Sequence, residues 1–191
     1  MEAARALLSD GVTPTVEAAA ERAGVARTTA YRYFPQQHAL LLATYPELDA
    51  PSLLGAAPPS DAADRLEVVV KEFTRQVLEH EPEMRATLRV ALEPGGPPSR
   101  LPLRQGRGIG WIEDALAPLR ARMAGEGIHR LALAIRAAIG VEALVWLTDI
   151  GKLSRDDAVA TMRWSAQALL RSALSDNPPQ LTTSSHDQAN T

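Results

Sequence analysis

The chain has 191 residues, of which 46% are hydrophobic and only 4% aromatic, with a formal net charge of −3 and no cysteine. This length can hold a small N-terminal unit and one larger core. The lack of cysteine excludes disulfides, a thiol nucleophile and a zinc ribbon. The first residues lack the basic-then-apolar order of a signal peptide, and the longest nearly apolar stretch, residues 131–147, is shorter than a bilayer span of about 20 residues. We therefore expect a cytoplasmic protein without membrane association.

Residues 13–42 have the pattern of two short helices joined by a tight turn and followed by a third helix. Thr15 is placed to cap the first helix, predicted over Val16–Ala23. Gly24 can take the left-handed conformation that ends a helix. The second helix is predicted over Ala26–Phe34, with small or apolar residues at four-residue spacing on one face. The pattern is that of a helix-turn-helix, which makes double-stranded DNA the expected partner.

The outward face of this second helix is polar and suits the major groove. Its hydroxyls can reach phosphates or base edges, and arginine can hold guanine in a two-pronged contact. An ordinary three-helix core with a solvated face would give the same periodicity. The candidate DNA contacts on this helix are Arg27, Thr28, Thr29, Tyr31 and Arg32.

The segment Thr-Val-Glu-x-x-Ala-x-x-Ala-Gly-Val-x-x-x-Thr-x-Tyr-Arg-Tyr-Phe-Pro, from Thr15 to Pro35, closely resembles the DNA-binding domain of TetR-type repressors. Ala39-Leu40-Leu41 continues the resemblance, which covers roughly the first fifty residues. It implies a homodimer that places two recognition helices in successive major grooves of a palindromic operator. It also implies that a small-molecule effector in the C-terminal domain releases the DNA. Arg27, Thr28 and Thr29 would then approach bases, and Tyr31 a phosphate.

Three departures from the family pattern affect the predicted DNA contacts. Gln37 stands where the family often has a lysine aimed at a phosphate, and the loss of that charge removes one counterion-releasing contact. Ala26 stands where serine commonly caps the recognition helix, a difference of about 1 kcal/mol. Residues Met1 to Leu8 already lie inside what should be the first helix of the family's domain, ahead of the helix-turn-helix, so the basic arm that usually precedes that helix is missing. Thr15 and Gln37 complete the set of candidate DNA-binding residues.

The N-terminal part is acidic, since residues 1–50 hold four arginines against six carboxylates, for a net charge of −2. Phosphate neutralisation supplies much of the affinity for DNA. We therefore predict weak, strongly salt-sensitive DNA binding. The acidic balance leaves a second hypothesis open, in which the same fold binds a ligand or a partner protein without binding an operator.

The rest of the chain is predicted to be helical, so the fold class is all-α with two domains. Prolines punctuate the segment from Tyr45 to Ser60 and forbid a continuous helix there. The predicted parts are a helix-turn-helix domain at 1–45, a proline-rich joint at 46–59, a helical effector-binding and dimerisation domain at 60–175, and a disordered tail at 176–191.

Five helices are predicted in the second domain from apolar spacing and breakers. Ser60 is expected to cap the first helix and Pro82 to open the second, with Leu92 facing inward before a loop at 94–102. Pro118 is expected to kink the third helix. The five helices are expected from 60 to Pro82, from Pro82 to 93, and over 104–123, 128–150 and 154–175.

Aromatic and apolar residues in this domain are candidates for an effector pocket, although tryptophans are more often core filler. Glu142 lies among apolar residues, where an unpaired carboxylate would be costly. It is expected to pair with Arg136 or another arginine, or to meet a polar group of the ligand. The candidate pocket residues are Phe73, Met84, Leu88, Trp111, Glu142 and Trp146.

The last predicted helix has an apolar stripe that fits the four-helix dimer interface of TetR-like proteins. Periodicity alone also allows both final helices to lie inside a monomeric core. The candidate homodimer interface residues are Ala158, Met162, Ala166, Leu169, Leu170 and Ala173.

Enzymatic activity is not predicted, because the motifs that carry it are absent from the sequence. The histidines are scattered, and neither His-Glu-x-x-His nor Gly-x-Ser-x-Gly occurs. The three glycines Gly106, Gly108 and Gly110 follow no predicted strand, so a nucleotide loop is not expected either. We predict no catalytic residue, no metal and no cofactor.

Overall fold

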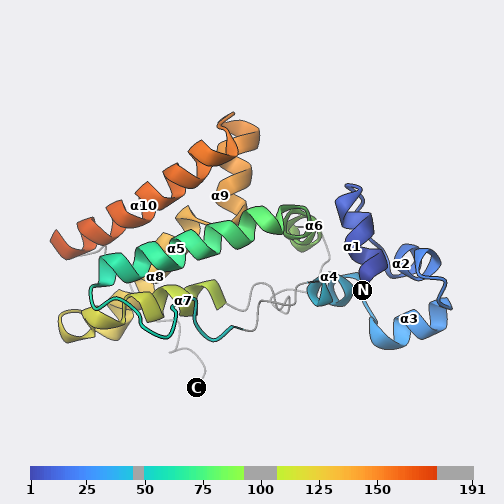
Figure 1. Cartoon of the computed structure of the whole chain (residues 1–191), viewed down its shortest axis with the longest axis horizontal. Coiled ribbons are helices and arrows are strands. Elements are labelled where there is room, and N and C mark those ends of the chain that lie inside the picture. The colour runs from blue at the N-terminus through green and yellow to red at the C-terminus, as the bar shows by residue number, and fades with distance from the viewer. Residues whose placement is uncertain (45–49, 93–106, 176–191) are drawn as a thin grey trace, which may run out of the picture.

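The computed structural model describes residues 1–44, 50–92 and 107–175, and every regular element in these ranges is helical (Figure 1). The predicted all-α class is confirmed. The loop predicted at 94–102, the tail at 176–191 and part of the predicted joint lie outside the described residues. The elements are α1 (Glu2–Ser9), α2 (Val16–Arg22), α3 (Arg27–Tyr33), α4 (Gln37–Ala43), α5 (Ala62–Glu79), α6 (Glu81–Leu92), α7 (Arg107–Ala115), the 3₁₀ turn η2 (Ala117–Ala121), α8 (Gly125–Ala138), α9 (Val141–Val145), the π turn η3 (Trp146–Ile150) and α10 (Arg155–Ser175).

The N-terminal domain consists of α1 to α4 around a small core. Ala4, Val16, Ala19 and Leu40 are buried there, and Phe34 packs against them. Because the apolar residues of α2 recur at helical spacing, one face of this short helix is sufficient to close the core.

The second domain is a bundle in which α5, α7, α8 and α10 each pack against two of the others. The apolar residues of α5 recur at spacings of three and four, and Leu66, Val70 and Val77 on that face are buried. The N-cap prediction was one residue early. Asp61, not Ser60, caps α5, and its Oδ1 accepts the backbone N–H of Ala63 at 2.8 Å. A carboxylate at this position also interacts favourably with the helix dipole.

The predicted continuous helix over 128–150 was wrong. The chain leaves α8 at an extended Ile139, and Gly140 has φ +102°, a conformation that L side chains rarely adopt. Arg136 Nη1 donates to the Ile139 carbonyl at 2.9 Å and lies where a Cβ on Gly140 would be. The segment Gly125–Ile150 is apolar and long enough to span a membrane by composition, but it is divided at this glycine and α9 turns away from α8 (Figure 1).

Pro118 also ends a helix instead of merely kinking it. The predicted helix over 104–123 is described from Arg107, runs as α7 to Ala115 and continues as the short turn η2, which contains Pro118. The missing N–H and the ring of proline explain this change.

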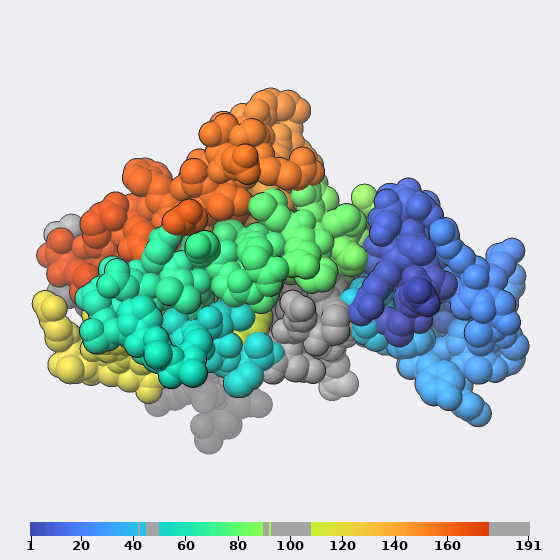
Figure 2. Space-filling view, in the orientation of Figure 1, coloured from blue at the N-terminus to red at the C-terminus, as the bar shows by residue number. Residues whose placement is uncertain are grey.

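Helix α6 connects the two domains. Pro82 is its second residue, as predicted, and Ala86 on α6 is buried against Leu8 and Leu41. Arg89 Nη1 donates to Thr13 Oγ1 at 3.1 Å. Figure 2 shows the N-terminal domain as a blue lobe at one end of the molecule, next to α6 in light green. Leu92, which was expected to face inward, is instead exposed at the end of α6.

Candidate nucleic-acid interface

The predicted helix-turn-helix is formed by α2, the turn at Gly24 and α3. Thr15 Oγ1 accepts the backbone N–H of Ala18 at 3.1 Å, so it caps α2 as expected. Gly24 has φ +65° and ends the helix in the left-handed conformation. The backbone N–H of Val25 then donates to the Ala20 carbonyl at 2.9 Å. These contacts fix the angle at which α3 leaves the turn.

Helix α3 lies against the N-terminal core with only one face. Ala30 and Phe34 are half-buried and pack on that core, and no residue of Arg27–Tyr33 is fully buried. Ala26 provides no side-chain cap, as its identity predicted. The helix therefore presents Arg27, Thr28 and the residues that follow on an exposed surface at the end of the molecule away from α10 (Figure 1).

The end of α3 carries an exposed aromatic residue that the sequence analysis did not select. The side chain of Tyr33 is 66% exposed, and the Arg32 guanidinium lies 5.4 Å from the centre of its ring. A stacked arginine and an exposed tyrosine can contact sugars, phosphates or bases together. The sequence could have indicated Tyr33, because it lies four residues after Thr29 and so shares a face of the helix with that candidate DNA contact.

Tyr31 is not an isolated side chain on this surface. Its hydroxyl donates a hydrogen bond to the carboxylate of Glu17 in the first turn of α2. This bond is the main reason why the pKa of Glu17 is lowered, with Arg27 nearby adding to the effect. The same bond raises the pKa of Tyr31. A negative charge thus lies beside the predicted phosphate contact.

Gln37 at the start of α4 holds the backbone in place. Its Nε2 donates to the Pro14 carbonyl at 3.0 Å, which ties α4 to the segment before α2. Thr15 is likewise engaged with the backbone as the cap of α2. Both residues support the geometry of the helix-turn-helix through these contacts.

The arginines of the N-terminal domain are distributed unevenly. Arg5 Nε donates to the Thr44 carbonyl at 3.1 Å, and Arg22 pairs with Asp10 at 2.7 Å. Arg27 and Arg32, by contrast, both lie on α3. Although residues 1–50 are acidic overall, positive charge is therefore gathered on the helix that faces outward.

Comparison with known proteins agrees with this geometry. Residues 1–44 match the family described as bacterial regulatory proteins, tetR family. The match covers α1 to α4, so the N-terminal domain is a DNA-binding domain of the TetR type. No curated protein matches the chain. The matched domain supports a DNA-binding regulator.

Several of the predicted effector-site residues come together in the second domain. The rings of Phe73 and Trp111 pack edge to face with centroids 5.9 Å apart, and Arg136 lies 5.5 Å from the Phe73 centroid. Arg136 pairs with Glu142 at 3.1 Å, which confirms the predicted ion pair. Gly108 of α7 faces this group, since a Cβ there would lie 3.3 Å from Arg136 Cδ.

Other predicted effector-site residues are placed differently. Met84 and Leu88 on α6 are half-buried against the same core. Trp146 does not join the group, because its side chain is 63% exposed on η3. The break at Gly140 changes the direction of the chain, so the helical phase assumed for Trp146 does not hold.

The predicted dimer stripe on α10 was wrong for its central residues. Ala158, Met162, Ala166 and Leu170 are buried inside the protomer, because α5 and α8 pack on this face of α10. Leu169 and Ala173 are half-buried against the same core. The opposite face of α10 carries Trp164, whose side chain is 67% exposed. A stripe at this spacing looks the same in a protomer core and in a dimer interface.

Proposed function

We propose that this TetR family chain is a cytoplasmic transcriptional repressor that binds a palindromic operator as a homodimer and is released by a small-molecule effector. The observation that carries the proposal is the exposed face of α3, which buries none of its seven residues fully yet is held to the core of the domain through Ala30 and Phe34. A short polar helix held in this way is the element that enters a major groove.

The proposed contacts follow from position along α3. Arg27, Thr28 and Thr29 at its N-terminal end approach base edges, and Tyr31 approaches a phosphate. Arg32 and Tyr33 extend the surface at the other end of the helix. A bidentate arginine contact to guanine discriminates by about 1–3 kcal/mol against the wrong base.

We assign the homodimer interface to the outer face of α10 around Trp164. Large exposed apolar side chains that gather on one surface commonly mark an interaction site. Trp146 and Ile150 on the adjoining turn η3 are also exposed, and η3 packs on α10. A second copy of the chain would cover these side chains and place the second recognition helix on the other half-site.

The effector is proposed to act on the cluster of Phe73, Trp111, Arg136 and Glu142, with Met84 and Leu88 on α6 next to the same core. Aromatic rings give an organic ligand apolar contact, and the ion pair offers polar groups that fix its orientation. Binding there would favour a conformation with a different separation of the two recognition helices.

DNA selection tests the operator proposal. Genomic fragments selected by the purified protein are converted to labelled duplexes, and their affinity is measured against random DNA at low salt. We expect a preference for a palindrome that falls strongly with Arg32→Ala and Tyr31→Ala. Arg22→Ala is the matched control, because Arg22 pairs with Asp10 on the surface and does not belong to α3. Equal affinity for palindromic and random DNA would instead favour the ligand- or protein-binding hypothesis.

A fluorescence screen tests the effector proposal. In the double variant Trp146→Phe and Trp164→Phe only the buried Trp111 remains, so its quenching reports on the predicted cluster and not on the surface. Compounds that quench Trp111 are then tested for release of the operator. Binders that never change DNA affinity would refute release by this site.

A further inference from the structure

Helix α6 contacts both domains through different side chains. Ala86 and Arg89 contact the N-terminal domain, at Leu8, Leu41 and Thr13. The residues Glu81 and Arg85, one turn earlier, contact the second domain. The position of α6 therefore sets the position of the DNA-binding domain.

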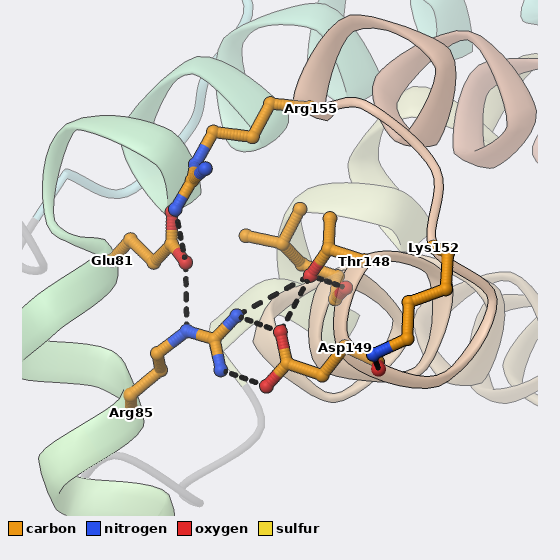
Figure 3. Close-up of polar contacts among 7 residues, drawn as sticks. Glu81, Arg85, Thr148, Asp149, Lys152 and Arg155 are labelled. Atoms are coloured by element: carbon orange, nitrogen blue, oxygen red, sulfur yellow. Dashed lines mark hydrogen bonds and ion pairs between the residues drawn. The ribbon is translucent and has the colours of Figure 1, made fainter.

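A chain of four charged side chains fixes α6 to η3 and to the start of α10 (Figure 3). Arg155 Nε lies 2.7 Å from Glu81 Oε2, and Arg85 Nε lies 2.7 Å from Glu81 Oε1. The terminal nitrogens of Arg85 donate to both carboxylate oxygens of Asp149, Nη1 to Oδ2 at 2.7 Å and Nη2 to Oδ1 at 2.9 Å. We call these four residues the α6 network. Two arginines and two carboxylates alternate in it, so its net charge is zero.

The α6 network differs from the Arg75 triad on α5 in the burial of its central carboxylate and in the elements that it joins. The Glu81 side chain is only 9% exposed, and its partners Arg155 and Arg85 come from two different elements. Arg75 also bridges two carboxylates, Glu72 and Glu79, but all three lie on the outer surface of α5. Removal of one charge from a shielded network leaves another without its partner, whereas an exposed pair contributes little.

The segment that carries Asp149 combines limited core packing with several polar contacts. Leu147 packs against the core, but no residue of η3 is fully buried. Thr148 Oγ1 lies 2.9 Å from Asp149 Oδ1, 2.8 Å from the Leu144 carbonyl oxygen and 3.3 Å from Arg85 Nη2. Lys152 has φ +59° and its Nζ donates to the Asp149 carbonyl at 2.6 Å (Figure 3). A segment with so few buried contacts depends on these bonds for its position.

We propose that the α6 network is a lock that holds α6 against η3, and that η3 is a second point at which the placement of the DNA-binding domain is controlled. This point is separate from the cluster around Phe73 and Trp111. When η3 moves, Asp149 leaves Arg85, α6 keeps only its tie to Arg155 at that end, and the N-terminal domain that rests on Ala86 changes its position. The consequence for transcription rests on the proposed operator binding, whereas the lock itself is a property of the fold.

Distance measurements between spin labels test the lock without DNA. The chain has no cysteine, so Ser9→Cys on α1 and Ala134→Cys on α8 label one exposed site in each domain. Labelled protein is mixed with an excess of unlabelled protein, so that each dimer holds at most one labelled protomer. We expect Asp149→Asn and Arg85→Ala to broaden or shift the distance distribution. Arg75→Ala is the matched control and should leave the distribution unchanged.

Operator affinity is the second measurement on the same variants. We expect a change of about fivefold or more for Asp149→Asn, in the range typical of coupling between sites. Helix content checked by circular dichroism shows that a variant is folded, and the exposed Asp149→Asn serves if Arg85→Ala does not fold. Folded variants with the distance distribution of the unmodified protein would overturn the lock. If the distances change while even the unmodified protein shows no operator preference, the lock is supported and the operator proposal fails.

Discussion

Glu17 and Tyr31 show how one contact between side chains changes what α3 offers to DNA. The carboxylate fixes the tyrosine hydroxyl on the surface, and it also brings a negative charge to the place where a phosphate is expected. These two effects oppose each other, because a fixed side chain binds with a smaller loss of entropy while a like charge repels the phosphate. Substitutions at Glu17 separate the two effects.

Glu17→Gln is expected to tighten operator binding by up to about fivefold, because it removes a single surface charge that repels the phosphate. The amide keeps an acceptor for Tyr31 and removes the charge. Titrations by fluorescence anisotropy at several salt concentrations measure the change. Glu17→Ala is the comparison, because it also removes the charge but no longer holds Tyr31. If Glu17→Gln weakened binding, the carboxylate itself would be required.

The break between α8 and α9 determines where the following elements lie. Because Gly140 directs the chain away from α8, η3 reaches α6 and Asp149 meets Arg85. One glycine with a positive φ thus places a charged residue against a helix far away in the sequence. Two predictions concern these elements.

Gly140→Ala is expected to destabilise the fold by about 1–3 kcal/mol, because its Cβ would meet Arg136 Nη1 at 2.5 Å and its φ of +102° is strained for alanine. Urea denaturation followed by circular dichroism measures the change. Gly110→Ala in α7 is the control, since a Cβ there meets nothing within 4 Å and alanine favours a helix. Equal effects of the two substitutions would show that Gly140 has no special conformational role.

The Asp149 carboxylate predicts a pH dependence of stability. The hydrogen bond from Arg85, followed by that from Thr148, lowers the pKa of Asp149 to about 2 from 3.8, and Lys152 contributes as well. A lowered folded-state pKa stabilises the fold fully above pH 3.8, and this contribution is lost as the pH falls towards 2.

Urea midpoints of the unmodified protein and Asp149→Asn should therefore differ at neutral pH and converge as the pH falls from about 4 to about 2. The pKa of the Glu81 carboxyl is lowered as well. Burial acts to raise the pKa of its carboxyl, but the hydrogen bonds from Arg155 and Arg85 outweigh burial and lower it. A difference that persisted unchanged down to pH 2 would contradict the role of the Asp149 charge.

The whole molecule is expected to function as a dimer joined through α10. Trp164→Glu should yield monomers in sedimentation velocity experiments, because a carboxylate cannot be buried against a second copy without a partner. The loss of the second half-site should lower operator affinity at least about a hundredfold. Val68→Glu is the control, since Val68 is also exposed but lies on α5. Dimers that survive Trp164→Glu would place the interface elsewhere.

The sequence was sufficient for features that depend on neighbouring residues. Thr15 and Gly24 delimit α2 through local backbone bonds, and the apolar spacing of α5 predicts its buried face. The contact of Tyr31 with Glu17, and that of Arg85 with Asp149 64 residues away, depend on the packing of separate helices. The sequence alone could not predict them. The stripe of α10 was misassigned because its spacing does not tell which helix covers it.

Ala86 is buried with Leu8 and Leu41 where α6 meets the DNA-binding domain, so a larger side chain at this position would displace that domain. In the proposed dimer, such a displacement would change the distance between the two recognition helices, and with it the half-site spacing that the dimer prefers. Substitutions at Ala86 would then alter the preferred operator without changing the exposed surface of α3.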